Sequence, residues 1–195
     1  YDRTPEGAEA REPPGQYVTE KFPGLHYGTV PEYSDLEQAW DLRVWGEIEE
    51  AARLSFAEFR ALPTTEIVTD IHCVTRWSKL DTRWEGVRFS DFLKALPALK
   101  PSAKHVVAHC EQGFTANVPL EVLMHPDAML AYKFDGAELT PEHGYPLRLL
   151  TPKKYFWKSA KWLRGLEFMD SDRPGFWERA GYHMQGDPWL EERFG

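Results

Sequence analysis

The chain has 195 residues, and its 31 acidic residues outnumber its 23 basic residues, so the formal net charge at pH 7 is −8. A chain of this length is typical of one domain with a sizeable core. No basic block offsets the acidic excess, which argues against a nucleic-acid partner. No segment approaches the roughly 20 apolar residues that a membrane-spanning helix needs, so we predict no membrane span.

The chain contains two cysteines, Cys73 and Cys110. Two are too few for the disulfide framework of a small secreted domain, although one bridge between them is possible by count. The N-terminus lacks a basic region followed by an apolar core, the pattern of a secretory signal. These features predict a cytoplasmic protein. Because the chain begins with Tyr1 rather than Met, an export signal removed earlier is compatible with the sequence.

The first 34 residues are rich in proline and glycine and show little periodicity, which predicts an extended lead-in. We assign residues 1–19 to this lead-in and residues 20–195 to the domain. The domain contains no internal repeat and no low-complexity linker, so we expect a single folding unit.

Three elements are predicted in the first half of the domain. Apolar and polar side chains alternate over residues 40–48, which indicates a half-buried strand. Ser55, with Glu58 three positions later, forms a capping box for a short helix that Pro63 ends. Residues 66–74 are apolar and β-branched, which is typical of a buried strand.

The second half continues the mixture of short helices and strands. A helix is predicted after Ser90, and Pro97 marks its end. Asp135 and Gly136 form a tight turn between two strands. Further strand-like segments are residues 105–111, 146–150 and 161–168. The fold class is therefore α+β.

Cys73 ends an apolar run and is followed closely by Arg76, Trp77 and Lys79. Cationic neighbours lower the pKa of a thiol and favour the thiolate, which attacks electrophiles or binds soft metals. We therefore expect a reactive or metal-binding cysteine. A buried structural cysteine is the alternative on these residues alone.

The C-terminal half gathers basic and hydroxyl side chains. Lys158, Ser159 and Lys161 alternate in a pattern that can cradle a phosphate, and Arg148 offers a planar fork for oxyanions. This pattern suits a phosphorylated heterocyclic cofactor. A solvated basic edge strand would show the same residues.

Four ordered segments, "HCVTRWS", "HGYPLRLL", "WKSAKWLRGLEF" and "DRPGFWERAGYH", together resemble the molybdopterin-binding domain of sulfite-oxidase-type oxidoreductases. The resemblance extends from about residue 20 to the C-terminus. It includes small stand-alone bacterial proteins and the catalytic subunit of protein-methionine-sulfoxide reductase. It implies the sulfite-oxidase-type molybdopterin-binding fold, with mixed β-sheets and short helices.

The resemblance implies that Cys73 is the one protein ligand of molybdenum, which is also held by the dithiolene of one molybdopterin. A soft thiolate suits such a centre and leaves coordination sites for oxygen exchange. Cys73 is then an anchor rather than a nucleophile. Arg76 and Trp77 are expected near the metal, where Arg76 would orient a polar or oxyanionic substrate.

Other residues match positions at which the family binds the cofactor. The residues that match its pterin-binding and phosphate-holding positions are His143, Arg148, Ser159, Ala160 and Lys161. His26 and Tyr27 fall where the family's N-terminal segment reaches the pterin. Thr115 and Asn117 are expected to face the cofactor. Cys110 is expected to be a small buried residue without a catalytic role.

The chain departs from sulfite oxidases in one motif, because no arginine occurs between Phe22 and Gly28. This puts sulfite in doubt and favours a reductase of S-oxides or N-oxides over an oxidase. The expected activity is oxygen-atom transfer to or from a small sulfur or nitrogen substrate. No haem domain is recognisable, so an unidentified electron donor or acceptor is the expected partner.

Two alternatives stay open. The same fold could bind or carry the cofactor without turnover. A thiol-dependent hydrolase could use Cys73 with His72 or His109, but adjacent residues on a strand point to opposite faces, which makes His72 a poor base.

Overall fold

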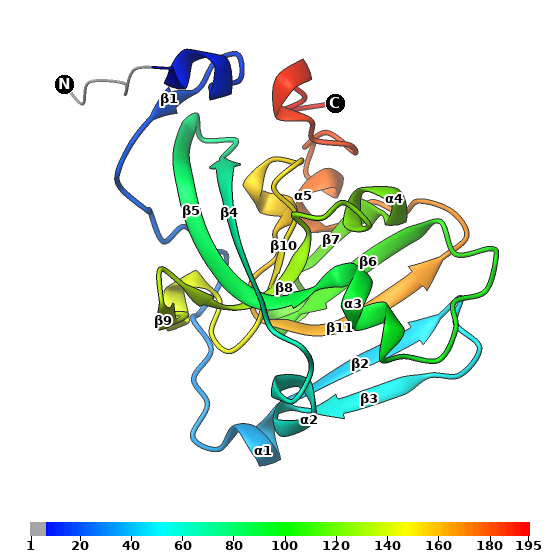
Figure 1. Cartoon of the computed structure of the whole chain (residues 1–195). Coiled ribbons are helices and arrows are strands. Elements are labelled where there is room, and N and C mark those ends of the chain that lie inside the picture. The colour runs from blue at the N-terminus through cyan, green and yellow to red at the C-terminus, as the bar shows by residue number, and fades with distance from the viewer. Residues whose placement is uncertain (1–6) are drawn as a thin grey trace.

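The computed structural model describes residues 7–195, which form two β-sheets connected by short helices and long loops (Figure 1). The predicted α+β class is confirmed, with mixed sheets and α-helices of only four to six residues. The loops between the elements carry most of the candidate site. Within residues 7–195, no helix is long and apolar enough to cross a membrane.

The six-stranded sheet is built around β5 (Trp77–Arg88), the longest strand of the fold. β5 pairs antiparallel with β4 (Thr65–His72) and β8 (Met129–Phe134), and parallel with β1 (Tyr17–Val18). β8 continues the sheet to β10 (Arg148–Leu150) and β9 (Ala137–Glu138). β5 was not predicted: Lys79, Asp81 and Arg83 alternate as in a half-buried strand, but the opposite face includes the polar Ser78 and Thr82, which only the structure shows to be buried.

The five-stranded sheet has the order β3 (Ala52–Ser55), β2 (Asp41–Gly46), β11 (Leu163–Met169), β6 (His105–Cys110) and β7 (Thr115–Pro119). β2 and β11 are parallel, and all other neighbours are antiparallel. The predicted strands at residues 40–48, 105–111 and 161–168 are thus confirmed, with ends shorter by a few residues.

The helices are α1 (Leu36–Ala39), α2 (Phe56–Arg60), α3 (Phe89–Lys94), α4 (Leu120–Leu123) and α5 (Phe176–Arg179). Single 3₁₀ turns lie at η1 (Ala8–Arg11), η2 (Glu111–Gly113), η3 (Pro141–His143), η4 (Phe156–Lys158) and η5 (Pro188–Leu190). The predicted capping box of α2 is confirmed, because Ser55 Oγ accepts from the Glu58 N–H at 3.1 Å and Glu58 Oε2 accepts from the Ser55 N–H at 2.8 Å.

The main hydrophobic core lies between the two sheets, and a second apolar cluster covers the other face of the six-stranded sheet. β8 shows this division: Leu130 and Tyr132 face the main core, whereas Met129 and Ala131 face the second cluster. This alternation follows from the two-residue period of a strand. Cys73 belongs to the second cluster, and Cys110 is a small buried member of the main core, as expected.

The N-terminal lead-in is attached to the six-stranded sheet. Residues 1–6 lie outside the described part of the chain, but Arg11 forms an ion pair with Asp70. β1 then adds to the edge of β5. Residues 7–19 therefore pack on the same unit as the rest of the domain.

Candidate functional site

A cavity of about 240 Å³ lies beside the second apolar cluster, and segments far apart in the sequence line it. Nine of the ten residues predicted to be catalytic or to bind the cofactor are among them: His26, Tyr27, Cys73, Trp77, His143, Arg148, Ser159, Ala160 and Lys161. Arg76 is the exception, because its guanidinium turns away from the cavity and donates to the Gly15 carbonyl at 3.5 Å.

Cys73 follows β4 and begins the turn that leads into β5. The Cys73 N–H donates to the Trp77 carbonyl at 2.9 Å, and the Arg76 N–H donates to the Cys73 carbonyl at 3.0 Å. Arg76 has a positive φ of 79°, an unusual conformation for a residue other than glycine. The turn points Cys73 into the cavity and Arg76 out of it.

The expectation that Arg76 and Lys79 lower the pKa of Cys73 is wrong. Burial raises the pKa of the thiol, and the hydrogen bonds from Thr75 and the Val74 N–H oppose this only in part. Lys79 donates to the Glu20 carbonyl instead. Thr75 Oγ1 lies 3.0 Å from Cys73 Sγ.

The same geometry speaks against a thiol hydrolase. His72 Nδ1 is hydrogen bonded to Ser78 Oγ at 2.7 Å, and His109 Nε2 is 2.9 Å from Glu167 on the other sheet. Neither imidazole is placed to take a proton from Cys73. A protonated, buried thiol without a base is a poor nucleophile but can still become a metal ligand by losing its proton on binding.

Arg148, on β10, is a buried cation without an anionic partner. Its side chain is 1% exposed and donates to the carbonyls of His143 at 2.7 Å and Ser159 at 2.6 Å. Burial lowers the pKa of the guanidinium, whose ordinary value is high enough to keep it charged at neutral pH. In the described chain no carboxylate forms an ion pair with it.

Lys161 is a second cation of this kind. Its Nζ donates to the carbonyls of Leu25 and Glu142, and burial lowers the pKa of the ammonium group to about 7. Carbonyl oxygens solvate a cation but do not neutralise it. Arg148 and Lys161 therefore make the cavity a site that favours an anion.

The Ser159–Lys161 turn follows η4 and lies against β10. Ser159 Oγ accepts from the Thr151 N–H at 2.9 Å, and the Ala160 carbonyl accepts from the Leu149 N–H at 2.9 Å. These bonds hold the turn beside Arg148. The predicted grouping of this turn with Arg148 in one cavity is therefore observed.

His143 has a fixed orientation. Its Nε2 is 3.1 Å from the Phe22 carbonyl, its Nδ1 is 2.9 Å from Thr140 Oγ1, and its ring stacks on Phe22 with centroids 3.9 Å apart. His26 and Tyr27 also line the cavity and are exposed.

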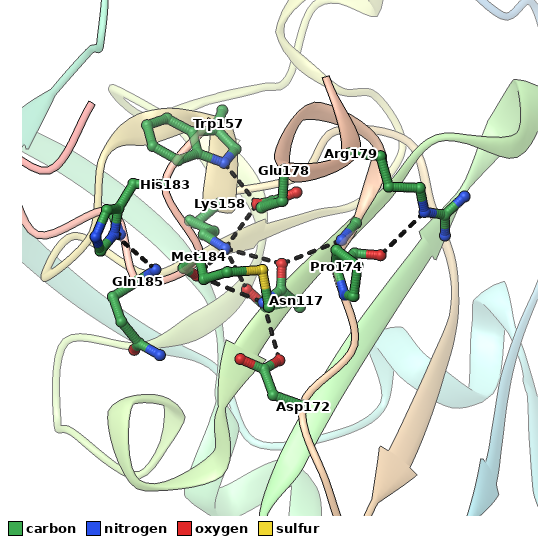
Figure 2. A network of polar contacts seen from close by, with 12 residues as sticks. Asn117, Trp157, Lys158, Asp172, Pro174, Glu178, Arg179, His183, Met184 and Gln185 are labelled. Atoms are coloured by element: carbon green, nitrogen blue, oxygen red, sulfur yellow. Dashed lines mark hydrogen bonds and ion pairs between the residues drawn. The ribbon is translucent and has the colours of Figure 1, made fainter. Parts of the chain in front are cut away.

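Lys158 does not take part in the cavity, contrary to the expected phosphate cradle. Its Nζ is 2.6 Å from Glu178 Oε1, and it also donates to the Met184 carbonyl and to the carbonyl and Oδ1 of Asn117 (Figure 2). Both oxygens of Asn117 therefore accept hydrogen bonds from Lys158. Neither Asn117 nor Thr115 lines the cavity, although both were expected to face the cofactor. This buried network joins η4, α5 and β7 behind the cavity wall.

An aromatic wall was largely missed from the sequence. Phe114, Trp157, Trp177 and Tyr182 line the cavity, while Trp84 is core. The Trp157 Nε1 donates to Glu178, so the buried network also fixes this wall. The high tryptophan content indicated that Trp157 or Trp162 could line a pocket, and the motif "GFWERAGYH" contains Trp177 and Tyr182 of this wall.

Residues 27–177 match the family described as the oxidoreductase molybdopterin binding domain. The chain belongs to this family. The uncharacterized oxidoreductase YuiH of Bacillus subtilis strain 168 is 50% identical over 184 residues, covering 94% of this chain and 92% of YuiH. The sulfite oxidase of Arabidopsis thaliana is 26% identical over 204 residues, covering 86% of this chain and 52% of that enzyme. The chain thus spans about half the length of the plant protein.

The crystal structure of the sulfane dehydrogenase SoxCD from Paracoccus pantotrophus has a TM-score of 0.68 with this fold at 24% identity. The match covers 80% of this chain and 43% of that chain. The predicted sulfite-oxidase-type fold is confirmed. The chain is an oxidoreductase of the molybdopterin-binding, sulfite oxidase-like family.

Proposed function

We propose that Cys73 is the protein ligand of a molybdenum cofactor and that the enzyme transfers an oxygen atom to or from a small sulfur or nitrogen substrate. The observation that carries this proposal is that Cys73, Arg148 and Lys161, from three separate segments, line one cavity. A soft sulfur ligand with two nearby cations suits a metal held by an anionic dithiolene that carries a phosphate.

Unpaired donors in the cavity fit such a group. Trp77 Nε1 and Arg148 Nε are buried and have no hydrogen-bond partner among the described residues. An unsatisfied buried donor costs about 1–3 kcal/mol. A pterin or phosphate, which offers nitrogen and oxygen acceptors, would remove this cost.

The protein residues would then have distinct roles. Cys73 would anchor the metal, and Arg148, Lys161 and the turn that begins at Ser159 would bind the anionic part of molybdopterin. His143 would present a ring that its two hydrogen bonds already orient. When bound, the cofactor supplies the two-electron oxygen-atom transfer chemistry, while the protein binds and orients.

The residues of the cavity wall favour a neutral substrate, and a neutral S-oxide or N-oxide is the substrate of a reductase. Apart from Arg148 and Lys161, no lysine or arginine of residues 7–195 lines the cavity. Tyr27, Trp177 and Tyr182 are aromatic. A desolvated dianion such as sulfite needs further cations, whereas an S-oxide or N-oxide is neutral overall. A separate electron donor would supply the electrons.

Metal analysis tests the ligand assignment. Protein from a host that makes the cofactor is expected to contain equimolar molybdenum, which Cys73→Ser should lose. Cys110→Ser is the matched control, because Cys110 is equally buried but does not line the cavity, and it should keep the metal. Folded wild-type protein without molybdenum would contradict the proposal.

A second assay tests the direction. Oxidation of reduced viologen is expected to accelerate on addition of methionine sulfoxide, dimethyl sulfoxide or trimethylamine N-oxide. Metal-loaded enzyme that stays at background with all three, and that instead oxidises sulfite, would refute the reductase.

A further inference from the structure

Two buried side chains hold the Cys73 turn from outside the cavity. Gln16 lies just before β1 and Arg193 lies near the C-terminus, and their relative exposures are 8% and 6%. Figure 1 shows the first and last described segments near the tip of the β4–β5 hairpin. Polar groups buried to this degree must form hydrogen bonds within the protein.

Gln16 bridges the start and the end of the turn. Its Nε2 is 2.9 Å from the Cys73 carbonyl, 2.9 Å from the Trp77 carbonyl and 3.2 Å from Ser78 Oγ. Because Cys73 and Trp77 are also joined by a backbone hydrogen bond, one amide fixes both ends of the loop. The side chain contacts the backbone of the proposed ligand without entering the cavity.

Arg193 completes the contact. Its guanidinium donates to the Val74 carbonyl at 2.6 Å and to Gln16 Oε1 at 2.6 Å, and it lies 5.0 Å from the centre of the buried Tyr155 ring. Its rigid fork therefore orients the Gln16 amide and binds the residue after Cys73 at the same time.

Together the two side chains bind three carbonyls of the turn, those of Cys73, Val74 and Trp77. The Cα–Cβ direction of a residue follows from its backbone, so a turn that is held at these carbonyls cannot redirect the Cα–Cβ bond of Cys73 without breaking buried hydrogen bonds. Loss of such a bond leaves unpaired buried groups, which is unfavourable.

We propose that Gln16 and Arg193 are positioning residues that fix the Cα–Cβ bond of Cys73 in the direction from which its sulfur binds the metal. The inference rests on the proposed role of Cys73 as the molybdenum ligand. The inference goes beyond that role, because it concerns two residues that do not line the cavity in which the cofactor is proposed to bind.

Two measurements test this on the full chain. Hydrogen exchange of the cofactor-free protein follows the Cys73 and Arg76 amides, both of which form turn hydrogen bonds. Gln16→Met is expected to speed their exchange about tenfold. The Mo(V) electron paramagnetic resonance spectrum of the loaded enzyme is expected to shift or to split into several species. Gln38→Met, an exposed glutamine on α1, is the matched control and should change neither.

Arg193 provides an independent variant. Arg193→Met is expected to alter the Mo(V) spectrum, and Arg193→Lys, which keeps the charge and one donor nitrogen but loses the planar fork, to restore it in part. If Gln16→Met fails to fold, this pair carries the test. Faster exchange with unchanged Mo(V) spectra would make both residues structural and would overturn the inference.

The outcome is separable from that of the proposed function. If Cys73→Ser keeps molybdenum with an unchanged spectrum, the ligand assignment fails and the inference fails with it. If the wild-type spectrum depends on Cys73 but the Gln16 and Arg193 variants match the wild type, only the positioning inference fails.

Discussion

The buried Lys158–Glu178 pair offers a quantitative test of the wall behind the cavity. Its side chains are 1% and 0% exposed, and Nζ lies 2.6 Å from Oε1. Glu178→Gln keeps the shape but leaves the ammonium group facing the neutral oxygens of Asn117 and Met184. Breaking a buried pair in this way costs about 3–5 kcal/mol. Since domains are stable by only about 5–15 kcal/mol, the loss should be large.

Urea unfolding of the cofactor-free protein measures this loss. The midpoint should fall with an unchanged slope, and the double variant Lys158→Met/Glu178→Gln should lose less than the sum of the single losses, because it contains no uncompensated charge. Glu138→Gln is the control: its pair with Arg60, at 3.6 Å, is largely exposed and should be worth under about 1 kcal/mol. Equal losses for Glu178→Gln and Glu138→Gln would refute the reasoning.

Three further predictions concern pH and backbone conformation. Sulfate, a dianion at all pH values used, should bind the cofactor-free cavity about tenfold more weakly at pH 8 than at pH 6. The reason is that Lys161 loses its proton near its pKa of about 7. Calorimetry measures this affinity, and Lys161→Met should show no such pH dependence. Burial lowers the pKa of His72 to about 4, so native His72 stays neutral above that pH while the unfolded state takes up a proton. This difference should lower the unfolding free energy by up to about 3 kcal/mol from pH 6.5 to pH 4. His72→Asn should make the decrease smaller by this amount, and the carboxylates with lowered pKa values, such as Glu167, should account for the rest. Gly46→Ala should lower the unfolding free energy measured in urea by more than about 2 kcal/mol, because φ is +96° and the new Cβ would lie 2.1 Å from the Phe168 carbonyl oxygen. Gly136→Ala, with φ +81° and open space around the new Cβ, should cost about 1 kcal/mol. Similar losses for the two variants would contradict the steric argument.

The site combines an anion-favouring interior with an uncharged aromatic wall. Arg148 and Lys161 are solvated only by carbonyls, so they are arranged for a ligand rather than for each other. Trp177 and Tyr182 add no charge to the wall they share. We expect this division to let one cavity bind the proposed anionic cofactor and favour the proposed neutral substrate.

Local features of the fold were predictable from the sequence. The capping box of α2 and the turn at Asp135-Gly136 depend on residues a few positions apart, so their patterns are visible without the rest of the chain. The ordered motifs around Cys73, Arg148 and Lys161 likewise indicated the family and most of the site. β5 was missed because its buried face includes the polar Ser78 and Thr82, whose burial depends on tertiary packing that the local sequence does not show.

The sequence by itself determined which side chains are available: one cysteine in a strand-to-turn segment, a basic C-terminal motif and many aromatics. Only the tertiary structure decided how they act. Arg76 follows Cys73 by three positions yet points away, because the turn gives it a positive φ, while Arg193 reaches the same turn from 119 residues away. Likewise, Lys158 and Lys161 look equivalent in sequence, but one pairs with Glu178 and the other faces the cavity. Burial and charge pairing depend on contacts between distant segments, which no local pattern encodes.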